Sequence, residues 1–353
     1  MPLFLNPNQV DVGHLRIMGG GGLYHASEMT NALEQDYRAV QQRAGLIDWP
    51  AWGVVEVVGA DRATFLHNLL SNDIKTLTPG RGCRAALLTP TAKLIAELLV
   101  LAEVERHWLL MPRVCIASAL AALDHYLITE DVTLADRTDA WTLLAIQGPN
   151  SSKVASALLD ASMPEAEGSR IIVGNGLRMV THSITGLPGL VLMVPPKEAA
   201  ATRTRLRNDG RQHGLVPVDW EAVNTCRLEA GIPWYGIDMD ETTLLPETGL
   251  ERQLASFTKG CYVGQEIVAR LDTYGSLSRK LMGLVCEGTV VPQRGDEIRK
   301  DDQPVGQITS ACLSPSLQRP SALGYVNRPH YEGDTTVTVL RQQHTIGATL
   351  RGV

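Results

Sequence analysis

The same order of expected strands and helices occurs twice in succession along the chain, and this repeat limits the possible folds more than any other feature of the sequence. The first run combines apolar stretches typical of strands with amphipathic stretches typical of helices. Its expected strands are 54–58, 84–89, 94–101 and 132–135, and its expected helices are 61–70 and 114–127. The resulting order, β-α-β-β-α-β, is that of the ferredoxin-like split unit.

The second run repeats this order. Its expected strands are 141–147, 178–183 and 190–194, its expected helices are 150–159 and 197–213, and a closing segment from Val216 leads into a further helix near 220–229. An element that is apolar on one face must bury that face against another layer. We therefore expect the two units to pack sheet against sheet and to leave a cleft between them.

Helical periodicity ends after Arg279 and Lys280. Short alternating stretches follow, separated by Gly, Pro and Asp, at 281–286, 307–311, 335–340 and 345–350. This pattern is typical of a small all-β barrel, so the chain as a whole is expected to be an α+β protein. The expected domains are a loose N-terminal extension at 1–33, which contains Gly19–Gly22, a two-unit region at 34–255 (units at roughly 50–136 and 140–255), a loop and linker at 256–280, and a barrel at 281–353.

Composition excludes several classes of function. The net charge of −6 argues against direct binding of DNA, because DNA-binding domains carry a basic face. No apolar run reaches the roughly 18–20 residues that span a membrane, and the N-terminus lacks the pattern of a secretion signal. The nine histidines occur singly, which argues against a stable metal site. We expect a cytoplasmic protein and a monomer.

The six cysteines form no C-x-x-C pair, so neither a disulfide framework nor a closed zinc site is expected. One of them, Cys261, lies between Gly260 and Gly264 in the polar stretch 256–270. Lys259, two residues before it, can favour the reactive thiolate form. A buried cysteine in a tight turn is an equally open interpretation of the same residues.

The stretch around Cys261 resembles the K-G-C-Y-x-G-Q-E motif of the YgfZ-type folate-binding proteins, which are related to the aminomethyltransferase (T-protein) of the glycine cleavage system. Further segments resemble motifs of the same superfamily, in its order, from about residue 35 to the end. They are the L-L-S-N-D-I segment at 69–74, Q-G-P at 147–149, R-L-E-A-G-I-P-W-Y-G at 227–236 and P-E-T-G-L at 246–250.

The resemblance implies a ring-like, three-domain fold around a central cavity that holds tetrahydrofolate or a related reduced folate. Its tail of carboxylates would need basic groups near the mouth, and its flat ring would need apolar walls. The expected cofactor-binding residues are Glu97, Leu98, Met111, Arg227, Tyr262 and Arg270. Leu94, Leu109 and Leu192 are further expected wall residues, and Arg252 and Arg279 are further expected residues of the mouth.

Four positions depart from the aminomethyltransferase pattern. The G-G-x-x-D-D-L segment appears here as 92–98, in which Ala96 replaces the first Asp and Glu97 replaces the second, the expected functional carboxylate. Leu187 and Val223 stand where the family has a Glu and an Arg. Because transfer chemistry depends on alignment within about 1 Å, a carboxylate moved by one methylene predicts that transfer is impaired or lost.

The leading functional hypothesis is a folate-binding accessory protein that supports iron–sulfur cluster assembly or repair, and through it tRNA modification. Clusters need four ligands, so Cys261 would act as a transient ligand or as a redox-responsive thiol beside iron–sulfur assembly or client proteins. Lys259, Gln265 and Glu266 would shape its loop. The alternative is a working tetrahydrofolate-dependent aminomethyltransferase or demethylase that uses Glu97, with Cys261 incidental. A third possibility is a scaffold that binds no folate.

Overall fold

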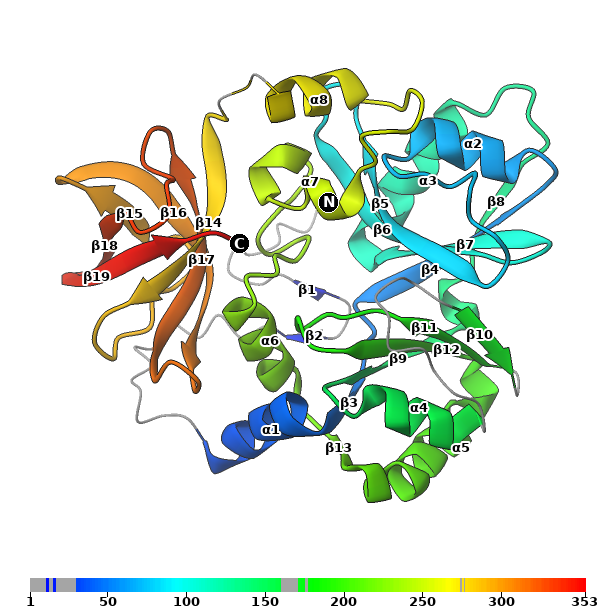
Figure 1. The fold of residues 1–353 in the computed structure, drawn as a ribbon, viewed down its shortest axis with the longest axis horizontal. Coiled ribbons are helices and arrows are strands. Elements are labelled where there is room, and N and C mark those ends of the chain that lie inside the picture. The colour runs from blue at the N-terminus through cyan, green and yellow to red at the C-terminus, as the bar shows by residue number, and fades with distance from the viewer. Residues whose placement is uncertain are drawn as a thin grey trace, which may run out of the picture.

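The computed structural model describes residues 11–12, 15–16, 30–159, 171–174, 177–273, 275 and 277–353. Two α/β units and a closed barrel make up the molecule, with helix α6 (Trp220–Glu229) and the segment that follows it between them (Figure 1). The expected N-terminal extension, including Gly19–Gly22, lies mostly outside the described residues. Its described parts are the two-residue strands β1 (Asp11–Val12) and β2 (Leu15–Arg16) and the start of helix α1 (Asn31–Gln42).

The first unit is an antiparallel sheet with the strand order β5-β6-β7-β4-β8. Its strands are β4 (Trp52–Val58), β5 (Arg81–Leu88), β6 (Leu94–Ala102), β7 (Arg106–Pro112) and β8 (Thr133–Asp136). Helices α2 (Arg62–Leu69) and α3 (Ile116–His125) cover one face. Strand β7 was not predicted from the sequence. Its residues from His107 to Pro112 are all buried. It therefore lacks the alternation of apolar and polar residues that marks a strand with one solvent-exposed face.

The second unit is a six-stranded sheet with the order β10-β11-β12-β9-β3-β13. Its strands are β3 (Ala44–Asp48), β9 (Thr142–Gln147), β10 (Ile171–Gly174), β11 (Leu177–Thr181), β12 (Gly189–Val194) and β13 (Leu215–Pro217). Helices α4 (Ser151–Leu159) and α5 (Pro196–Asp209) pack on its outer face. Strand β3 precedes the first unit in sequence but pairs with β9 and β13 of the second, so the two units are interleaved.

The inner faces of the two sheets pack against each other, as the repeat predicted. The first unit contributes Val54, Leu99, Leu101, Trp108 and Leu110, and the second contributes Leu143, Ala145, Val180, Val191 and Met193. Helices α1 and α6 close one edge of this core, where Val223 is fully buried. Because the shared core is apolar, separating the units would expose a large hydrophobic surface to water.

The C-terminal part is a closed six-stranded barrel, which confirms the predicted β domain. Around the barrel the order is β14-β17-β16-β15-β18-β19. The strands are β14 (Arg279–Cys286), β15 (Glu297–Lys300), β16 (Gln303–Ser314), β17 (Arg319–Asn327), β18 (Thr336–Arg341) and β19 (His344–Arg351). Strands β15 and β17 were not predicted. β17 contains Pro320 and Gly324, two residues that usually argue against a strand interior.

Short helical elements connect the three parts. They are α7 (Glu251–Leu254), α8 (Gln265–Thr273), and the 3-10 turns η2 (Arg113–Cys115), η3 (Thr138–Ala140), η4 (Arg211–His213) and η5 (Leu245–Thr248). The barrel is joined to α6 by polar contacts: Arg351 of β19 donates to the carbonyls of Leu228 and Glu229 at 3.1 and 3.0 Å. Among the described residues, no helix is long and apolar enough to cross a membrane.

Candidate functional site

The Cys261 loop (residues 256–264) is fixed to the first unit at both of its ends. At its start, the backbone N–H of Ser256 donates to the Ser71 carbonyl at 2.9 Å. At its end, Gly264 has φ +83°, and a Cβ there would lie 2.7 Å from the Thr89 carbonyl oxygen. Only glycine tolerates both this backbone conformation and this approach. The motif glycine therefore lets the loop end lie directly against the first unit.

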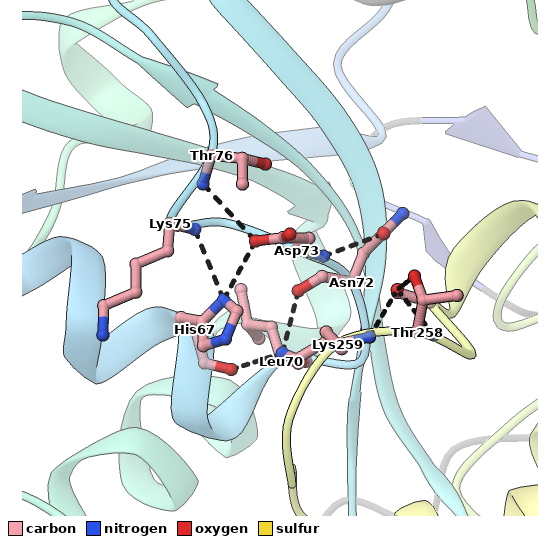
Figure 2. Close-up of polar contacts among 9 residues, drawn as sticks. His67, Leu70, Asn72, Asp73, Lys75, Thr76, Thr258 and Lys259 are labelled. Atoms are coloured by element: carbon pink, nitrogen blue, oxygen red, sulfur yellow. Dashed lines mark hydrogen bonds and ion pairs between the residues drawn. The ribbon is translucent and has the colours of Figure 1, made fainter.

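Lys259 anchors the middle of the loop. Its Nζ donates to the backbone carbonyls of His67, Leu70 (2.7 Å) and Asn72 (2.9 Å), which lie in and just beyond the last turn of α2 (Figure 2). Burial lowers the pKa of Lys259 to about 8, so the side chain is an ammonium at neutral pH. The sequence suggested that Lys259 favours a Cys261 thiolate. An ammonium has three N–H donors, and those of Lys259 are directed to the three carbonyls. None is then left for the sulfur of Cys261.

Cys261 is exposed, and the interpretation of a buried cysteine in a tight turn is wrong. Gly260 beside it is also exposed, whereas Tyr262 on the other side is 7% exposed and packs with Leu88 and Leu94. Burial raises the pKa to about 12 at each of the other five thiols. These are Cys83, Cys115, Cys226, Cys286 and Cys312.

The remaining motif residues begin helix α8. Glu266 lies in its first turn and Arg270 in its last turn, and both side chains are exposed. Opposite charges at these two ends match the helix dipole, which gives both residues a structural role. The backbone N–H of Gln265 donates to the Tyr262 carbonyl at 3.2 Å.

A second group of polar and aromatic side chains lies where the two units meet. Glu97 of β6 is 6% exposed, and its Oε1 accepts from Arg84 of β5 at 2.5 Å. Trp49 and Trp52 stack with ring centroids 4.6 Å apart, and the ring of His182 lies 5.9 Å from each. Burial and the Arg84 charge lower the pKa of His182 to about 3, so its imidazole is neutral at physiological pH. We call Trp49, Trp52, His182, Arg84 and Glu97 the interunit site.

The sequence motifs position His182. Gln147 of the Q-G-P turn is fully buried, donates to the His182 carbonyl at 3.1 Å and accepts from the Ile184 N–H at 3.0 Å. Gly189 ends the T-G-L-P-G segment at 185–189, in which Leu187 replaces the family's Glu, and it faces Gln147, because a Cβ there would lie 2.4 Å from the Gln147 amide. The two motifs, distant in sequence, therefore form one buried hydrogen-bonded corner that holds the backbone of the interunit site.

Several predicted pocket residues lie elsewhere. Leu98, Leu109 and Met111 pack against α2 and α3, and Leu192 packs against the outer helices of the second unit. They do not face the opposite unit, contrary to the expectation of cavity walls, because consecutive strand residues alternate between the two faces of a sheet. Leu94 does lie on the inner side, with Tyr262.

The predicted basic mouth is not assembled as expected. Arg227 is 1% exposed and forms a fully buried ion pair with Asp238, so it is not available at a mouth. Arg279 pairs with Glu247 at 3.1 Å. Arg252 is exposed and pairs with Asp272 at 2.6 Å. For Arg227 the pairing follows from burial, since an unpaired charge is costly to remove from water.

Sequence reasoning missed Trp49, Trp52 and His182. The available signal was a W-P-A-W run in a chain with only 5% aromatic residues. Nothing local indicated that His182, more than a hundred residues later, stacks on it. In the part of the chain that the structure describes, no group of three or more His, Cys, Asp or Glu side chains could hold a metal ion.

The neutral state of His182 predicts a pH-dependent stability. Its pKa is about 3 in the folded chain and ordinarily 6.5, so below pH 6.5 the unfolded chain binds a proton that the folded chain does not. The stability present above pH 6.5 should thus be lost as the pH falls toward 3, by up to about 1.4 kcal/mol per pH unit. Urea unfolding at pH 7 and pH 5 measures the loss.

His182→Phe, which retains the aromatic contact, should reduce this loss by about 2 kcal/mol. Part of the loss should persist, because burial also lowers the pKa of His107, to about 4. His344→Phe, at an exposed position, is the control and should change nothing. An unchanged pH dependence in His182→Phe would show that His182 accepts a proton in the folded protein.

Comparison with known proteins identifies the family. Residues 8–257 match the GCVT N-terminal domain, and residues 279–351 match the glycine cleavage T-protein C-terminal barrel domain. An aminomethyltransferase of Streptomyces coelicolor is 31% identical over 84% of this chain and 82% of its own length. An aminomethyltransferase of Bacillus velezensis is 28% identical over 91% of this chain and 88% of its own length.

The fold agrees with a solved structure. The glycine cleavage system aminomethyltransferase T of Bartonella henselae superposes with a TM-score of 0.81 at 21% identity, covering 91% of this chain and 88% of that one. This agreement confirms the predicted fold, and the two family matches confirm the predicted superfamily. The named relatives fit the alternative hypothesis, aminomethyl transfer, better than an iron–sulfur role, on which these comparisons are silent. The chain belongs to the glycine cleavage T-protein family, with its GCVT N-terminal domain followed by its C-terminal barrel domain.

Proposed function

We propose that this chain binds a reduced folate, of the tetrahydrofolate type, at the interunit site. The observation that carries the proposal is a buried carboxylate, Glu97, held by Arg84 where the stacked Trp49–Trp52 pair and the neutral His182 come from both units. A pterin offers a flat ring and an edge of N–H donors. Aromatic faces suit the ring, and a carboxylate suits the edge.

The residues of the site suit such a ligand in charge and in their aromatic surfaces. Arg84 contacts Oε1 of Glu97. We propose that the other oxygen, Oε2, accepts hydrogen bonds from the N–H groups at the pterin edge. Arg84 also donates to Gln253 at 2.5 Å, which ties the carboxylate indirectly to helix α7. A fixed carboxylate recognises donors at a lower entropic cost than a mobile one. A bound reduced folate would supply the carrier for a one-carbon unit.

We further propose that this protein acts through Cys261 as an accessory to iron–sulfur proteins. The support is the resemblance of its loop to the YgfZ-type motif, together with the contrast between an exposed Cys261 and five thiols whose pKa burial raises. A cluster usually needs four thiolates, so Cys261 would complete a ligand set that a partner protein mainly provides.

Aminomethyl transfer to tetrahydrofolate is the second candidate, and the names of the relatives support it. In that case Glu97 is the working carboxylate and Cys261 is incidental. The side chain of Glu97 is one methylene longer than the Asp of the family pattern, and Arg84 fixes it in place. Both features count against transfer, because a small misplacement of a reacting group lowers the rate strongly.

Calorimetry with tetrahydrofolate under reducing conditions tests folate binding. We expect micromolar binding by the wild type and a weakening of about 10- to 100-fold in Glu97→Gln, because a hydrogen bond to a charged group is worth about 1.5–3 kcal/mol. Glu105→Gln, at an exposed position of the same unit, is the matched control. If Glu97→Gln and Glu105→Gln bind tetrahydrofolate equally well, Glu97 is not part of the binding site. If the wild type does not bind tetrahydrofolate, the protein is a scaffold that binds no folate.

A transfer assay with tetrahydrofolate and a methylamine-type donor separates the two candidates. We expect no turnover by the wild type. Transfer that survives Cys261→Ser and disappears in Glu97→Gln would establish the aminomethyltransferase instead.

A further inference from the structure

Three backbone carbonyls converge on one nitrogen in the first unit. The oxygens of His67, Leu70 and Asn72 all accept from Lys259 Nζ (Figure 2). The last carbonyls of a helix have no partner within that helix. Here the N–H of Ser71, which would continue the helix to the His67 carbonyl, bonds to the Ala86 carbonyl instead. We call the three oxygens the carbonyl cage.

The turn that follows α2 shapes the cage. Asp73 Oδ1 lies 3.1 Å from His67 Nδ1, and the Asp73 N–H donates to Asn72 Oδ1 at 2.8 Å. The Lys75 N–H donates to His67 Nδ1 at 3.3 Å, and the Thr76 N–H donates to Asp73 Oδ1 at 3.4 Å. These contacts fold the chain back over the end of α2, so that the carbonyls of His67, Leu70 and Asn72, in and just beyond its last turn, face one point (Figure 2).

We propose that Lys259 is a positioning residue: its ammonium fills the carbonyl cage and thereby holds the Cys261 loop on α2 with Cys261 outward. The chain between the Lys259 anchor and buried Tyr262 consists only of Gly260 and Cys261. Each residue spans at most about 3.6 Å, so two residues between fixed ends have little freedom. The restriction keeps the thiol exposed and in one place.

Two further contacts of Lys259 add to the same anchor. Nζ lies 5.2 Å from the centre of the Tyr262 ring, so the ammonium contacts an aromatic face as well as the cage. Ser256 Oγ accepts from the N–H groups of Thr258 and Lys259 at 3.3 and 3.2 Å, which sets the direction of the lysine. The inference rests on the proposed function only in treating Cys261 as the reactive thiol.

Chemical rescue of Lys259→Ala in the full-length protein tests the proposal. Truncation leaves a space with three carbonyls that a small ammonium ion can occupy. We expect amide hydrogen exchange in 66–74 and 256–264 to accelerate at least about tenfold. The alkylation rate of Cys261 should change to the rate measured for the same cysteine in a free peptide of the loop sequence. Added methylammonium should restore both wild-type values.

The number of N–H donors should decide the extent of rescue. Methylammonium has three donors, and tetramethylammonium has none at a similar charge, so rescue should fall from the first to the second. Lys75→Ala removes an exposed lysine of the same turn and should match the wild type. Should Lys259→Ala fail to fold, Lys259→Arg replaces it. A planar guanidinium cannot present three hydrogens from one nitrogen to the cage, so accelerated exchange is again expected.

The proposal is overturned if Lys259→Ala, or its Arg replacement, behaves like Lys75→Ala in both measurements, or if tetramethylammonium rescues as well as methylammonium. Neither measurement involves folate, iron or a partner protein. A failure of the proposed function would therefore leave these results unchanged, and a failure of the carbonyl cage would leave folate binding unchanged.

Discussion

Replacing Arg227 by methionine is expected to lower the free energy of unfolding by about 3–5 kcal/mol, because it leaves a buried carboxylate without its partner. The side chains of Arg227 and Asp238 are 1% and 0% exposed. Arg227 also donates to the Ile232 carbonyl at 3.1 Å and stacks at 4.5 Å on the Trp234 ring. Its loss therefore affects the end of α6 and the turn that follows.

The effect should extend to the barrel. Asp238 accepts from Thr309 Oγ1 at 2.6 Å and from the Ser310 hydroxyl, and both residues belong to β16. Without its arginine, the Asp238 carboxylate would be protonated or hydrated by a water molecule at the junction between α6 and the barrel. We expect Arg227→Met to make the segment between α6 and β14 sensitive to limited proteolysis at protease concentrations that leave the wild type intact.

Urea unfolding at pH 7 measures the loss of stability. The control is Arg252→Ala, which removes an arginine from an exposed pair, with 65% of its side chain accessible, and should cost about 1 kcal/mol or less. The double variant Arg227→Met/Asp238→Leu should recover part of the loss, since no charge is then left unpaired, although Thr309 and Ser310 lose their acceptor. A change below about 1 kcal/mol in Arg227→Met would contradict the assignment of this pair as the anchor of the barrel.

The second large effect is functional. Cys261→Ala should keep the stability within about 0.5 kcal/mol of the wild type, because the side chain is exposed. The same variant should abolish the activity of iron–sulfur enzymes in a cell that depends on this protein. The physical reason is that alanine retains the loop and removes its only sulfur ligand or redox group.

Complementation of a deletion, with cluster-dependent enzyme activities as the readout, measures this effect. Cys83→Ala changes a thiol of the same unit whose pKa burial raises, and it should complement fully. In the purified protein, Cys261 should alkylate before the other five cysteines. Full complementation by Cys261→Ala would show that the loop acts through its backbone, and would favour aminomethyl transfer as the function.

Part of this fold follows from local sequence patterns. The helices at 61–70 and 114–127 were predicted within a few residues of α2 and α3, because their apolar positions repeat with the helical period. The barrel was predicted from alternation and turn residues alone. Strands β7 and β17 were missed, because one is buried throughout and the other contains residues that usually end strands.

The candidate site divides in the same way. The motif around Cys261 marked a loop whose cysteine is exposed, and the resemblance of spaced segments marked the family. The partners of Lys259 and Gln147 were not predictable, because they are contributed by distant parts of the chain. Lys259 meets carbonyls 187 to 192 residues earlier, and Gln147 meets the backbone of His182, 35 residues later.

Local patterns in the sequence specify the three parts of the protein, its family and the loop that carries Cys261. Periodicity, turn chemistry and motifs depend on neighbouring residues, which the chain order specifies directly. Tertiary contacts are needed to establish that Cys261 is exposed, that β3 belongs to the second sheet, that Trp49 and Trp52 meet His182, and that Lys259 binds carbonyls rather than a thiol. These features arise because burial brings together groups that must satisfy one another's hydrogen bonds and charges, whatever their distance along the chain.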